Sequence, residues 1–335
     1  MTERRHRIAA LGGGNGLSTV LRGLKAEDVD LTAIVTVADD GGSSGRLRRE
    51  LGVLPPGDIR NCLVALADDE SLLGQLFQHR FADGDLAGHS FGNLFLAALT
   101  EVTGSFDLAV RESSRVLKVN GRVLPSTLEQ VRLWAERADG TTVCGETQIG
   151  SGQGACRKVW LDPAPDAHPR TIDAILDADV VLLGPGSLFT SVLPHLAVRD
   201  IVEAVQDTRA LRVYVGNVMT QLGETEGFDA ADHLRHVVDA LDGAVDVAVV
   251  HEGPLDQVAI DRYALQGQEP VRVDSEAMAA LGVTVVRRDL AAPGQVVRHS
   301  PAALATVVME LVHNPPARRE VFASTTHLQP TPPAT

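Results

Sequence analysis

The sequence predicts an α/β protein, with a parallel sheet flanked by helices and a helical insertion. Short apolar runs rich in β-branched residues recur along the chain, and segments with helical spacing of apolar residues separate them. Several of these runs end in glycine-rich turns. Uncharged strands of this kind are buried in a parallel sheet, and the alternation of strand and helix places helices on both of its faces.

The first elements form a strand, a glycine turn and a helix, at residues 8–11, 12–16 and 17–24. A second apolar run at 31–37 predicts the next strand, and the prolines and aspartate before residue 59 suit the start of a helix at 59–66. From Leu72 to about Glu136 the apolar spacing is mostly helical. We interpret this region as a helical insertion that caps a site or builds an interface.

The second half returns to regular alternation after a few short strands around Val143, Glu146, Ile149 and 159–161, and a loop at 163–169. Further strands and helices are expected in this half. The strands are 180–183, 211–215, 245–250, 283–286 and 296–297, and the helices are 201–205, 230–241 and 302–312. We expect one domain over 1–323 and a disordered tail at 324–335, where proline and threonine dominate.

Composition excludes several classes of protein. The net charge of -14 argues against general binding to nucleic acid or to an anionic membrane surface. No apolar stretch approaches the roughly 18 uncharged residues of a spanning helix, and the amino terminus does not resemble a signal peptide. The three cysteines, Cys62, Cys144 and Cys156, form no metal or disulfide pattern. We therefore expect a cytoplasmic protein without a membrane span.

An acidic turn follows the strand at 31–37. Asp39 and Asp40 stand at its carboxyl end, where open α/β sheets bind ligands. Glycines at 41, 42 and 45 allow close approach of a ligand, and Ser43 and Ser44 add hydroxyl groups. The alternative is an ordinary acidic turn that caps the next helix.

Two glycine-rich turns each join a strand to a helix, which is typical of a phosphate-binding loop. The first lacks the ending of a Walker sequence, and Leu17 replaces the third glycine of the dinucleotide fingerprint. A purely structural turn is the alternative at each. The predicted binding residues are Gly12, Gly13, Gly14, Asn15 and Gly16 in the first turn, and Gly184, Gly186, Ser187 and Thr190 in the second.

Polar residues elsewhere are candidates for the same site. Asn217 follows the strand at 211–215 and suits recognition of a base or a sugar, or else caps a helix. Arg60 suits a phosphate or an aspartate, and Asn61 and Asn93 would line the same cleft. His89 is a candidate general base, although a lone histidine is more often a structural hydrogen-bonding group.

Six motifs in order resemble the YvcK family of gluconeogenesis factors, which is related to the CofD-type 2-phospho-L-lactate transferases. The resemblance covers about residues 8–311. The motifs are Gly12–Ser18, Val35–Arg46, Pro55–Asn61, Gly88–Asn93, Gly184–Ser191 and Asn217–Thr225.

This resemblance implies a Rossmann-like fold and a cytoplasmic bacterial protein that binds a UDP-sugar such as UDP-N-acetylglucosamine. It also implies a role in cell shape and cell-wall synthesis during growth on gluconeogenic carbon sources, a protein partner in envelope synthesis and a homo-oligomer. Tyr263 and Arg298 match the family's tyrosine and arginine tied to the nucleotide sugar, with Arg287 and Arg288 as alternatives to Arg298.

The transferase branch implies a second hypothesis. There Asp39 and Asp40 would hold Mg²⁺, a hard cation that takes one or two carboxylates plus phosphate oxygens, and His89 would move a proton. The chain shows no residues that we can assign to deazaflavin binding. We therefore favour a nucleotide-sugar-binding regulator over a Mg²⁺-dependent transferase.

Overall fold

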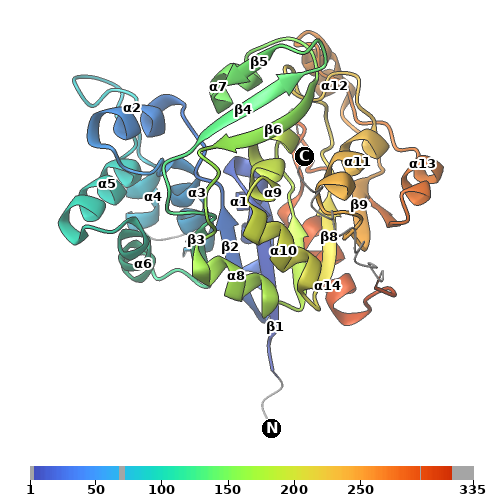
Figure 1. The fold of residues 1–335 in the computed structure, drawn as a ribbon, viewed down its shortest axis with the longest axis horizontal. Helices are drawn as coiled ribbons and strands as arrows, with labels where there is room; N and C mark the ends of the chain where they lie inside the picture. Colours follow the sequence, from blue (N-terminus) through green and yellow to red (C-terminus); the bar gives the residue numbers. More distant parts are fainter. Residues whose placement is uncertain (1–3, 68–71, 295, 319–335) are drawn as a thin grey trace, which may run out of the picture.

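The main sheet of the computed structural model, which describes residues 4–67, 72–294 and 296–318, contains seven strands in the order β10-β9-β8-β7-β1-β2-β3 (Figure 1). Every pairing in it is parallel, so the predicted α/β class and Rossmann-like sheet are confirmed. Its strands are β1 (His6–Gly12), β2 (Val29–Val35), β3 (Arg122–Pro125), β7 (Val180–Leu183), β8 (Leu211–Val215), β9 (Val247–His251) and β10 (Thr284–Arg288).

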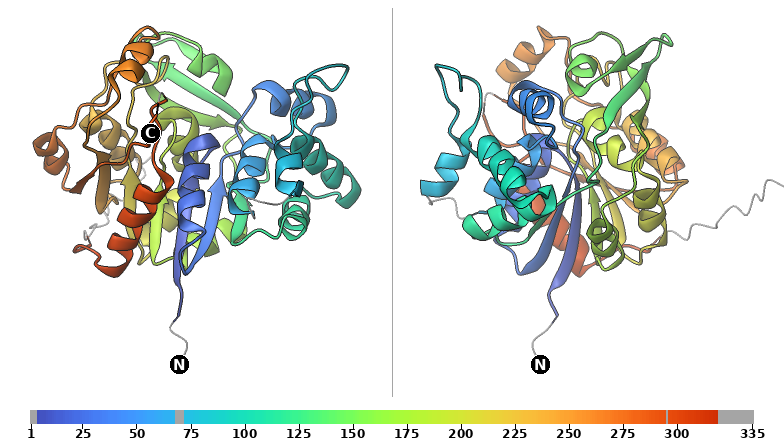
Figure 2. Two further views of the ribbon diagram at one scale, coloured as in Figure 1. Left: turned by 180° about the vertical axis from the view of Figure 1, so that it is seen from behind. Right: turned by 60° about the vertical axis from the view of Figure 1, so that its left-hand side comes forward.

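Helices cover both faces of this sheet. On one face α1 packs against α3 and α14, and on the other α10 packs against α8 and α9 (Figures 1 and 2). The helices are α1 (Gly14–Leu24), α2 (Gly42–Leu51), α3 (Gly57–Leu66), α4 (Leu72–Gln78), α5 (Phe91–Thr103), α6 (Phe106–Val116), α7 (Glu146–Gly150), α8 (Pro169–Leu176), the π-helix η1 (Leu188–Val192), α9 (Leu193–Leu196), α10 (Arg199–Asp207), α11 (Ala230–Ala240), α12 (Gln257–Ala264), α13 (Ser275–Ala280) and α14 (Pro301–His313).

The sheet changes its direction of winding between β1 and β7. The chain leaves β1 through α1 and returns as β2 on one side, whereas β7, much later in the sequence, pairs with β1 on the other side. A crevice opens at the carboxyl ends of two strands related in this way, because the connections that follow them lead to opposite sides. The fold therefore locates the expected ligand site after β1 and β7.

A small antiparallel sheet lies beyond the carboxyl ends of the central strands, at the top of Figure 1. It consists of β4 (Arg132–Arg137), β5 (Thr142–Cys144) and β6 (Cys156–Asp162). The short strands expected near Val143 and 159–161 are confirmed, but Glu146 and Ile149 belong to α7. Gly145 has a φ of +99°, which ends β5 and turns the chain into this helix.

The helical insertion is shorter than the apolar spacing predicted. Helices α4, α5 and α6 end at Val116, and the helical interpretation of 117–136 is wrong because β3 and β4 occupy that region. The burial of β4 alternates with a period of two residues, as in a strand with one covered face. The expected strand at 296–297 is also wrong, since only an isolated bridge joins Ala291 to His299 there.

Helix α1 begins at Gly14, earlier than the expected residue 17, and the acidic turn leads directly into α2 at Gly42, for which the sequence predicts no bounds. The predicted tail at 324–335 lies outside the described residues. Within the described ranges, we find no helix that is both long enough and apolar enough to cross a membrane.

Candidate functional site

A polar cleft of about 420 Å³ lies at the carboxyl ends of β1, β7 and β8. It brings together the first glycine turn, the second glycine turn, the loop after β8 and five residues from the last third of the chain. The predicted binding residues that line it are Gly13, Gly14, Asn15, Gly16, Gly186, Ser187, Asn217, Tyr263 and Arg298.

The first glycine turn presents the start of α1 to this cleft. Gly13 is the N-cap residue and has no side chain with which to cap the helix. The two glycine turns touch here, because a Cβ atom on Gly16 would lie 2.2 Å from the carbonyl oxygen of Pro185. Gly12 ends β1 and its carbonyl oxygen is hydrogen-bonded to Nε2 of buried His195 at 3.0 Å. Gly12 thus supports the turn without lining the cleft.

The second glycine turn differs at its helix start. The amide of Phe189 donates to Oε2 of Glu224 at 3.1 Å, and the hydroxyl of Thr190 donates to Oε1 of the same carboxylate at 3.1 Å. Burial raises the pKa of Glu224 to about 7. Gly184 and Thr190 therefore lie behind the cleft, and only Gly186 and Ser187 of the predicted residues in this turn line it.

A chain of side-chain amides links the third loop to the second turn. Asn217 donates from Nδ2 to Oε1 of Gln221 at 3.3 Å, and Gln221 donates from Nε2 to the hydroxyl of Ser187 at 2.7 Å. The alternative role of Asn217 as a helix cap is wrong, because no helix follows it before α11. Gln221, which belongs to the same sequence motif as Asn217, is thereby held in place for recognition of a polar ligand.

Tyr263 and Arg298 close the far side of the cleft. The Tyr263 hydroxyl, on α12, donates to the carbonyl oxygen of Val297 at 3.5 Å, and the Arg298 side chain is exposed. His299 also lines the cleft, and burial lowers its pKa to about 4, so its ring is neutral near pH 7. Sequence reasoning missed His299, because a lone histidine has no spacing pattern.

Three carboxylates gather around the start of α1. Asp39 accepts a hydrogen bond from the Gly41 amide at 2.8 Å, and Oδ2 of Asp58 would lie 2.7 Å from a Cβ atom on Gly13. Burial and the charge of Asp39 raise the pKa of Asp58 to about 6, and those two causes raise the pKa of Glu146 to about 9. Oε2 of Glu146 is buried and has no hydrogen-bond partner among the described residues, and Glu146 lines the cleft.

Asp40 does not line the cleft and is held at the start of α7. Its Oδ1 accepts hydrogen bonds from the amide and the hydroxyl of Thr147, at 3.0 and 2.9 Å. The alternative that this acidic pair supplies the N-cap of α2 is wrong, since Gly41 is the N-cap. In the described part of the chain, no group of three or more histidine, cysteine or acidic side chains is arranged to hold a metal ion.

The remaining predicted residues form a largely buried network beside the acidic turn and do not line the cleft. The contacts are Ser43 Oγ to His89 Nδ1 at 2.9 Å, Asn93 Nδ2 to Ser43 Oγ at 3.1 Å, Arg60 Nη2 to Asn61 Oδ1 at 2.6 Å and the Gly57 amide to Ser44 Oγ at 3.0 Å. Burial and the charge of Arg46 lower the pKa of His89. This network ties the acidic turn to α3 and α5.

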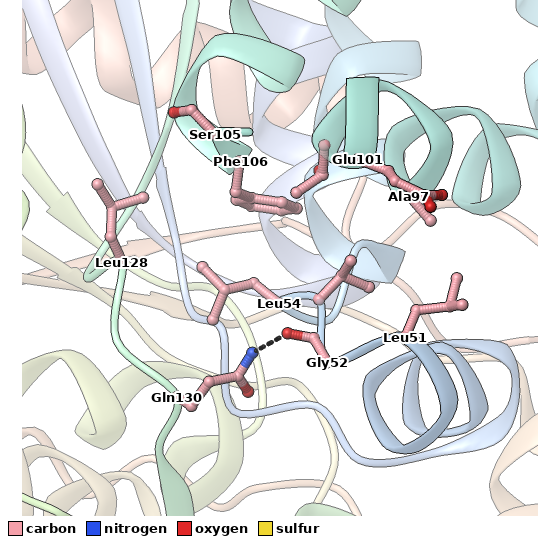
Figure 3. A pocket seen from close by; sticks show the side chains of 11 residues that line it. Leu51, Gly52, Leu54, Ala97, Glu101, Ser105, Phe106, Leu128 and Gln130 are labelled. Atoms are coloured by element: carbon pink, nitrogen blue, oxygen red, sulfur yellow. Dashed lines mark hydrogen bonds between the residues drawn. The ribbon is translucent and has the colours of Figure 1, made fainter. Parts of the chain in front are cut away.

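An apolar pocket of about 560 Å³ lies elsewhere, between α2, α5 and α6 (Figure 3). Leu51, Leu54, Phe106 and Leu128 face it, and it contains none of the predicted binding residues. Its lining offers few groups for a diphosphate, so the polar cleft remains the candidate site.

The chain resembles known proteins over most of its length. The family described as 2-phospho-L-lactate transferase CofD matches residues 8–291. A gluconeogenesis factor of Halalkalibacterium halodurans is 47% identical over 312 residues, which cover 92% of this chain and 97% of the relative. A gluconeogenesis factor of Bacillus subtilis is 47% identical over 310 residues, with coverage of 91% and 98%.

A solved structure agrees with this relationship. The crystal structure of a member of the UPF0052 family from Bacillus halodurans superposes with a TM-score of 0.89 at 47% sequence identity. The match covers 92% of this chain and 99% of that chain.

Proposed function

The chain belongs to the CofD family, in which it is similar to the gluconeogenesis factors, and from this premise we propose that it is a regulatory protein that binds a nucleotide sugar of the UDP-N-acetylglucosamine type. In this proposal the occupied protein acts in the cytoplasm of a bacterium during growth on gluconeogenic carbon sources. A protein partner of cell-envelope synthesis recognises the occupied state, and cell shape depends on it.

The composition of the polar cleft is the observation that supports this proposal most strongly. Amides at a glycine turn suit a diphosphate, and the linked amides of Asn217 and Gln221 suit the base or the sugar hydroxyls. Tyr263 and Arg298, which the family resemblance ties to the nucleotide sugar, line the same cleft although they are distant in sequence. A nucleotide sugar would thereby contact all the elements that meet at this edge of the sheet.

The cleft offers one carboxylate, that of Glu146, to a divalent cation, and the carboxylates of Asp39 and Asp58 lie behind its lining. The buried, unpartnered Oε2 of Glu146 and the mutual repulsion that raises the pKa values of Asp58 and Glu146 are both relieved by a bound cation. Mg²⁺ takes oxygen ligands from one or two carboxylates and from phosphates. Glu146 would hold it together with phosphate oxygens of the ligand, and when bound it would offset the negative charge of a diphosphate.

Calorimetric titration of the full chain with UDP-N-acetylglucosamine, with and without Mg²⁺, tests this function. We expect micromolar binding that Mg²⁺ strengthens, and chromatography should recover the nucleotide sugar intact. Absence of heat both with and without Mg²⁺ would contradict the proposed ligand.

Two variants assign the binding to the cleft. Arg298→Ala should weaken binding about tenfold or more, because it removes a cation that faces an anionic ligand. Arg235→Ala is the matched control, since Arg235 is an exposed arginine on α11 that pairs with nearby Asp232. Equal affinities in the two variants would place the nucleotide sugar somewhere else.

A Mg²⁺-dependent transferase of the 2-phospho-L-lactate type is the second candidate function, and the acidic group beside α1 favours it. His89 would then need to reach the reacting groups, but it belongs to the buried network next to Ser43 rather than to the lining of the cleft. Chromatography of the recovered ligand distinguishes the candidates, because cleavage or transfer products would indicate the enzyme.

A further inference from the structure

A second cavity, which the Asp40 side chain helps to line, lies between α2 and the small antiparallel sheet. Its volume is about 630 Å³, and it shares no lining residue with the polar cleft. The two cavities are neighbours, since Gly145 lines this cavity and the next residue, Glu146, lines the cleft. The carboxylate of Asp40 packs against Gly145, since a Cβ atom added to this glycine would lie 2.0 Å from Oδ2 of Asp40.

Three arginines line this cavity, although the protein has a net charge of -14. Arg48 and Arg49 come from the last turn of α2, and Arg132 comes from β4. Two carboxylates also line it. Asp40 accepts a hydrogen bond from Thr147. Asp162 is the cross-strand neighbour of Arg132, but in the described part of the chain the two side chains form no ion pair.

The position of Arg48 is fixed by the protein. Its Nη2 donates to the carbonyl oxygen of Val131, which holds the guanidinium group between α2 and the small sheet. Burial lowers the pKa of Arg48, Asp40 opposes that shift, and the charge of Arg132 lowers the pKa further. A guanidinium group is therefore partly desolvated close to a second one, an arrangement that a bound anion would stabilise.

An ordinary structural role explains only part of this arrangement. Cations in the last turn of a helix interact favourably with its dipole, which accounts for Arg48 and Arg49. It does not account for Arg132, which reaches the same cavity from a different element and forms no ion pair with a carboxylate in the described residues. Convergence of three arginines from two elements is typical of recognition of phosphate.

We propose that this cavity, the arginine pocket, binds a small phosphorylated compound whose phosphate group is held by Arg48, Arg49 and Arg132. This ligand is distinct from the nucleotide sugar of the cleft, and the pocket does not depend on that assignment. Because Gly145 lines the pocket and the next residue, Glu146, lines the cleft, the pocket would bring a second small molecule next to the candidate site.

Cys144 provides a local probe of occupancy. It lines the arginine pocket and is partly exposed, whereas Cys62 and Cys156 are buried. Alkylation of Cys144 by iodoacetamide, located by peptide mass spectrometry, should slow saturably when inorganic phosphate or glycerol 3-phosphate is added to the full chain. Sodium chloride of equal ionic strength should leave the rate unchanged. No saturable protection up to about 10 mM of either compound would overturn the proposal.

Variants connect this protection to the arginines. The double variant Arg49→Ala with Arg132→Ala should need about tenfold more phosphate for equal protection, because two charge-assisted contacts are lost. Arg157→Ala is the matched control, since Arg157 lies on the same small sheet outside the pocket and pairs with Glu136. Unchanged protection in the double variant, or an equal loss in Arg157→Ala, would overturn the proposal.

A competition experiment excludes an indirect effect of the cleft. Excess UDP should leave the protection of Cys144 by inorganic phosphate intact, because the two cavities have no lining residue in common. Complete loss of protection on addition of UDP would show that phosphate acts from the cleft, and would overturn the proposal.

Discussion

The two glycine-rich turns follow neighbouring strands and look alike in sequence, but they differ in what occupies the start of the helix behind them. At the first turn, Asn15 and Gly16 at the start of α1 line the cleft. At the second turn, the carboxylate of Glu224 already accepts the Phe189 amide and the Thr190 hydroxyl at the start of η1. The first turn therefore still presents two residues of its helix start to a ligand, although Asp58 accepts a hydrogen bond from the Gly14 amide beside them. The second turn is closed by the carboxyl group of Glu224.

This difference shows that a glycine turn before a helix is a necessary pattern for anion binding but not a sufficient one. Amides at a helix start bind whichever anion reaches them, and that anion can be a side chain from another part of the chain. Glu224 lies 35 positions after Phe189, so the local sequence does not reveal it. Substitutions at each turn can therefore measure how far the two differ in role.

The largest effect is expected where the two turns touch. Gly16→Ala would place a Cβ atom 2.2 Å from the Pro185 carbonyl oxygen and 2.9 Å from Cα of Gly186, and backbone atoms cannot move aside cheaply. We expect a loss of about 3 kcal/mol in the free energy of unfolding, measured by urea denaturation. Gly150→Ala is the control, because nothing described lies within 4 Å of its added Cβ. A stability of Gly16→Ala close to that of this control would contradict the close contact of the turns.

The next largest effect concerns the closed turn. Glu224→Ala leaves the buried Phe189 amide and Thr190 hydroxyl without their acceptor, which should cost about 2 kcal/mol of unfolding free energy. Glu203→Ala, which removes an exposed glutamate paired with Arg199, should change stability by less than about 0.5 kcal/mol. If instead Glu224→Ala were as stable as the wild type and bound phosphate more tightly, the role of Glu224 would be to block an anion-binding site rather than to cap the helix.

A pH-dependent effect on stability is expected at the first glycine turn, where Asp58 lies. The pKa of Asp58 is raised from 3.8 to about 6 by burial and by Asp39, so between these pH values the folded state retains a proton that the unfolded state has lost. The contribution of Asp58 to stability therefore falls as pH rises through that window. An asparagine side chain at this position would have no such titration.

Asp58→Asn should accordingly gain thermal stability relative to the wild type, by a few degrees in Tm, as pH rises from about 4 to about 7 in the absence of Mg²⁺. Differential scanning calorimetry at matched ionic strength measures the difference. A constant difference in Tm across that range would mean that Asp58 titrates normally in the folded protein.

The smallest effect is expected at the part of the second turn that lines the cleft. Ser187→Ala removes the acceptor for Gln221 Nε2 but leaves the glycines and Glu224 in place, so affinity for UDP-N-acetylglucosamine should fall only about threefold. Ser151→Ala, at the exposed end of α7, serves as the control for the calorimetric titration. A loss of two orders of magnitude would show that the second turn contributes as much to binding as the first.

Much of the fold follows from local pattern. The apolar runs at 8–11, 180–183 and 211–215 lie in central strands of the sheet, since short, largely apolar segments suit strands that are buried on both faces. The glycine turns after β1 and β7 are equally visible in the sequence. The wrong predictions lie outside the central strands, at 117–136 and at Glu146. Short segments there have an apolar spacing that fits either a helix or a strand, and contacts with neighbouring elements decide which of the two forms.

By itself, the sequence determined the α/β class, the order of the central strands along the chain with their glycine turns, and the polar motifs from which the site is built. Tertiary structure alone decided which of these motifs face one cleft, because that depends on strand order in the sheet and on side-chain direction. It brought Glu146 and Asp58 to the start of α1, turned Asp40 toward Thr147, and closed the second turn with Glu224. Each outcome is a contact between residues far apart in the chain, where burial and charge act through space rather than along the sequence.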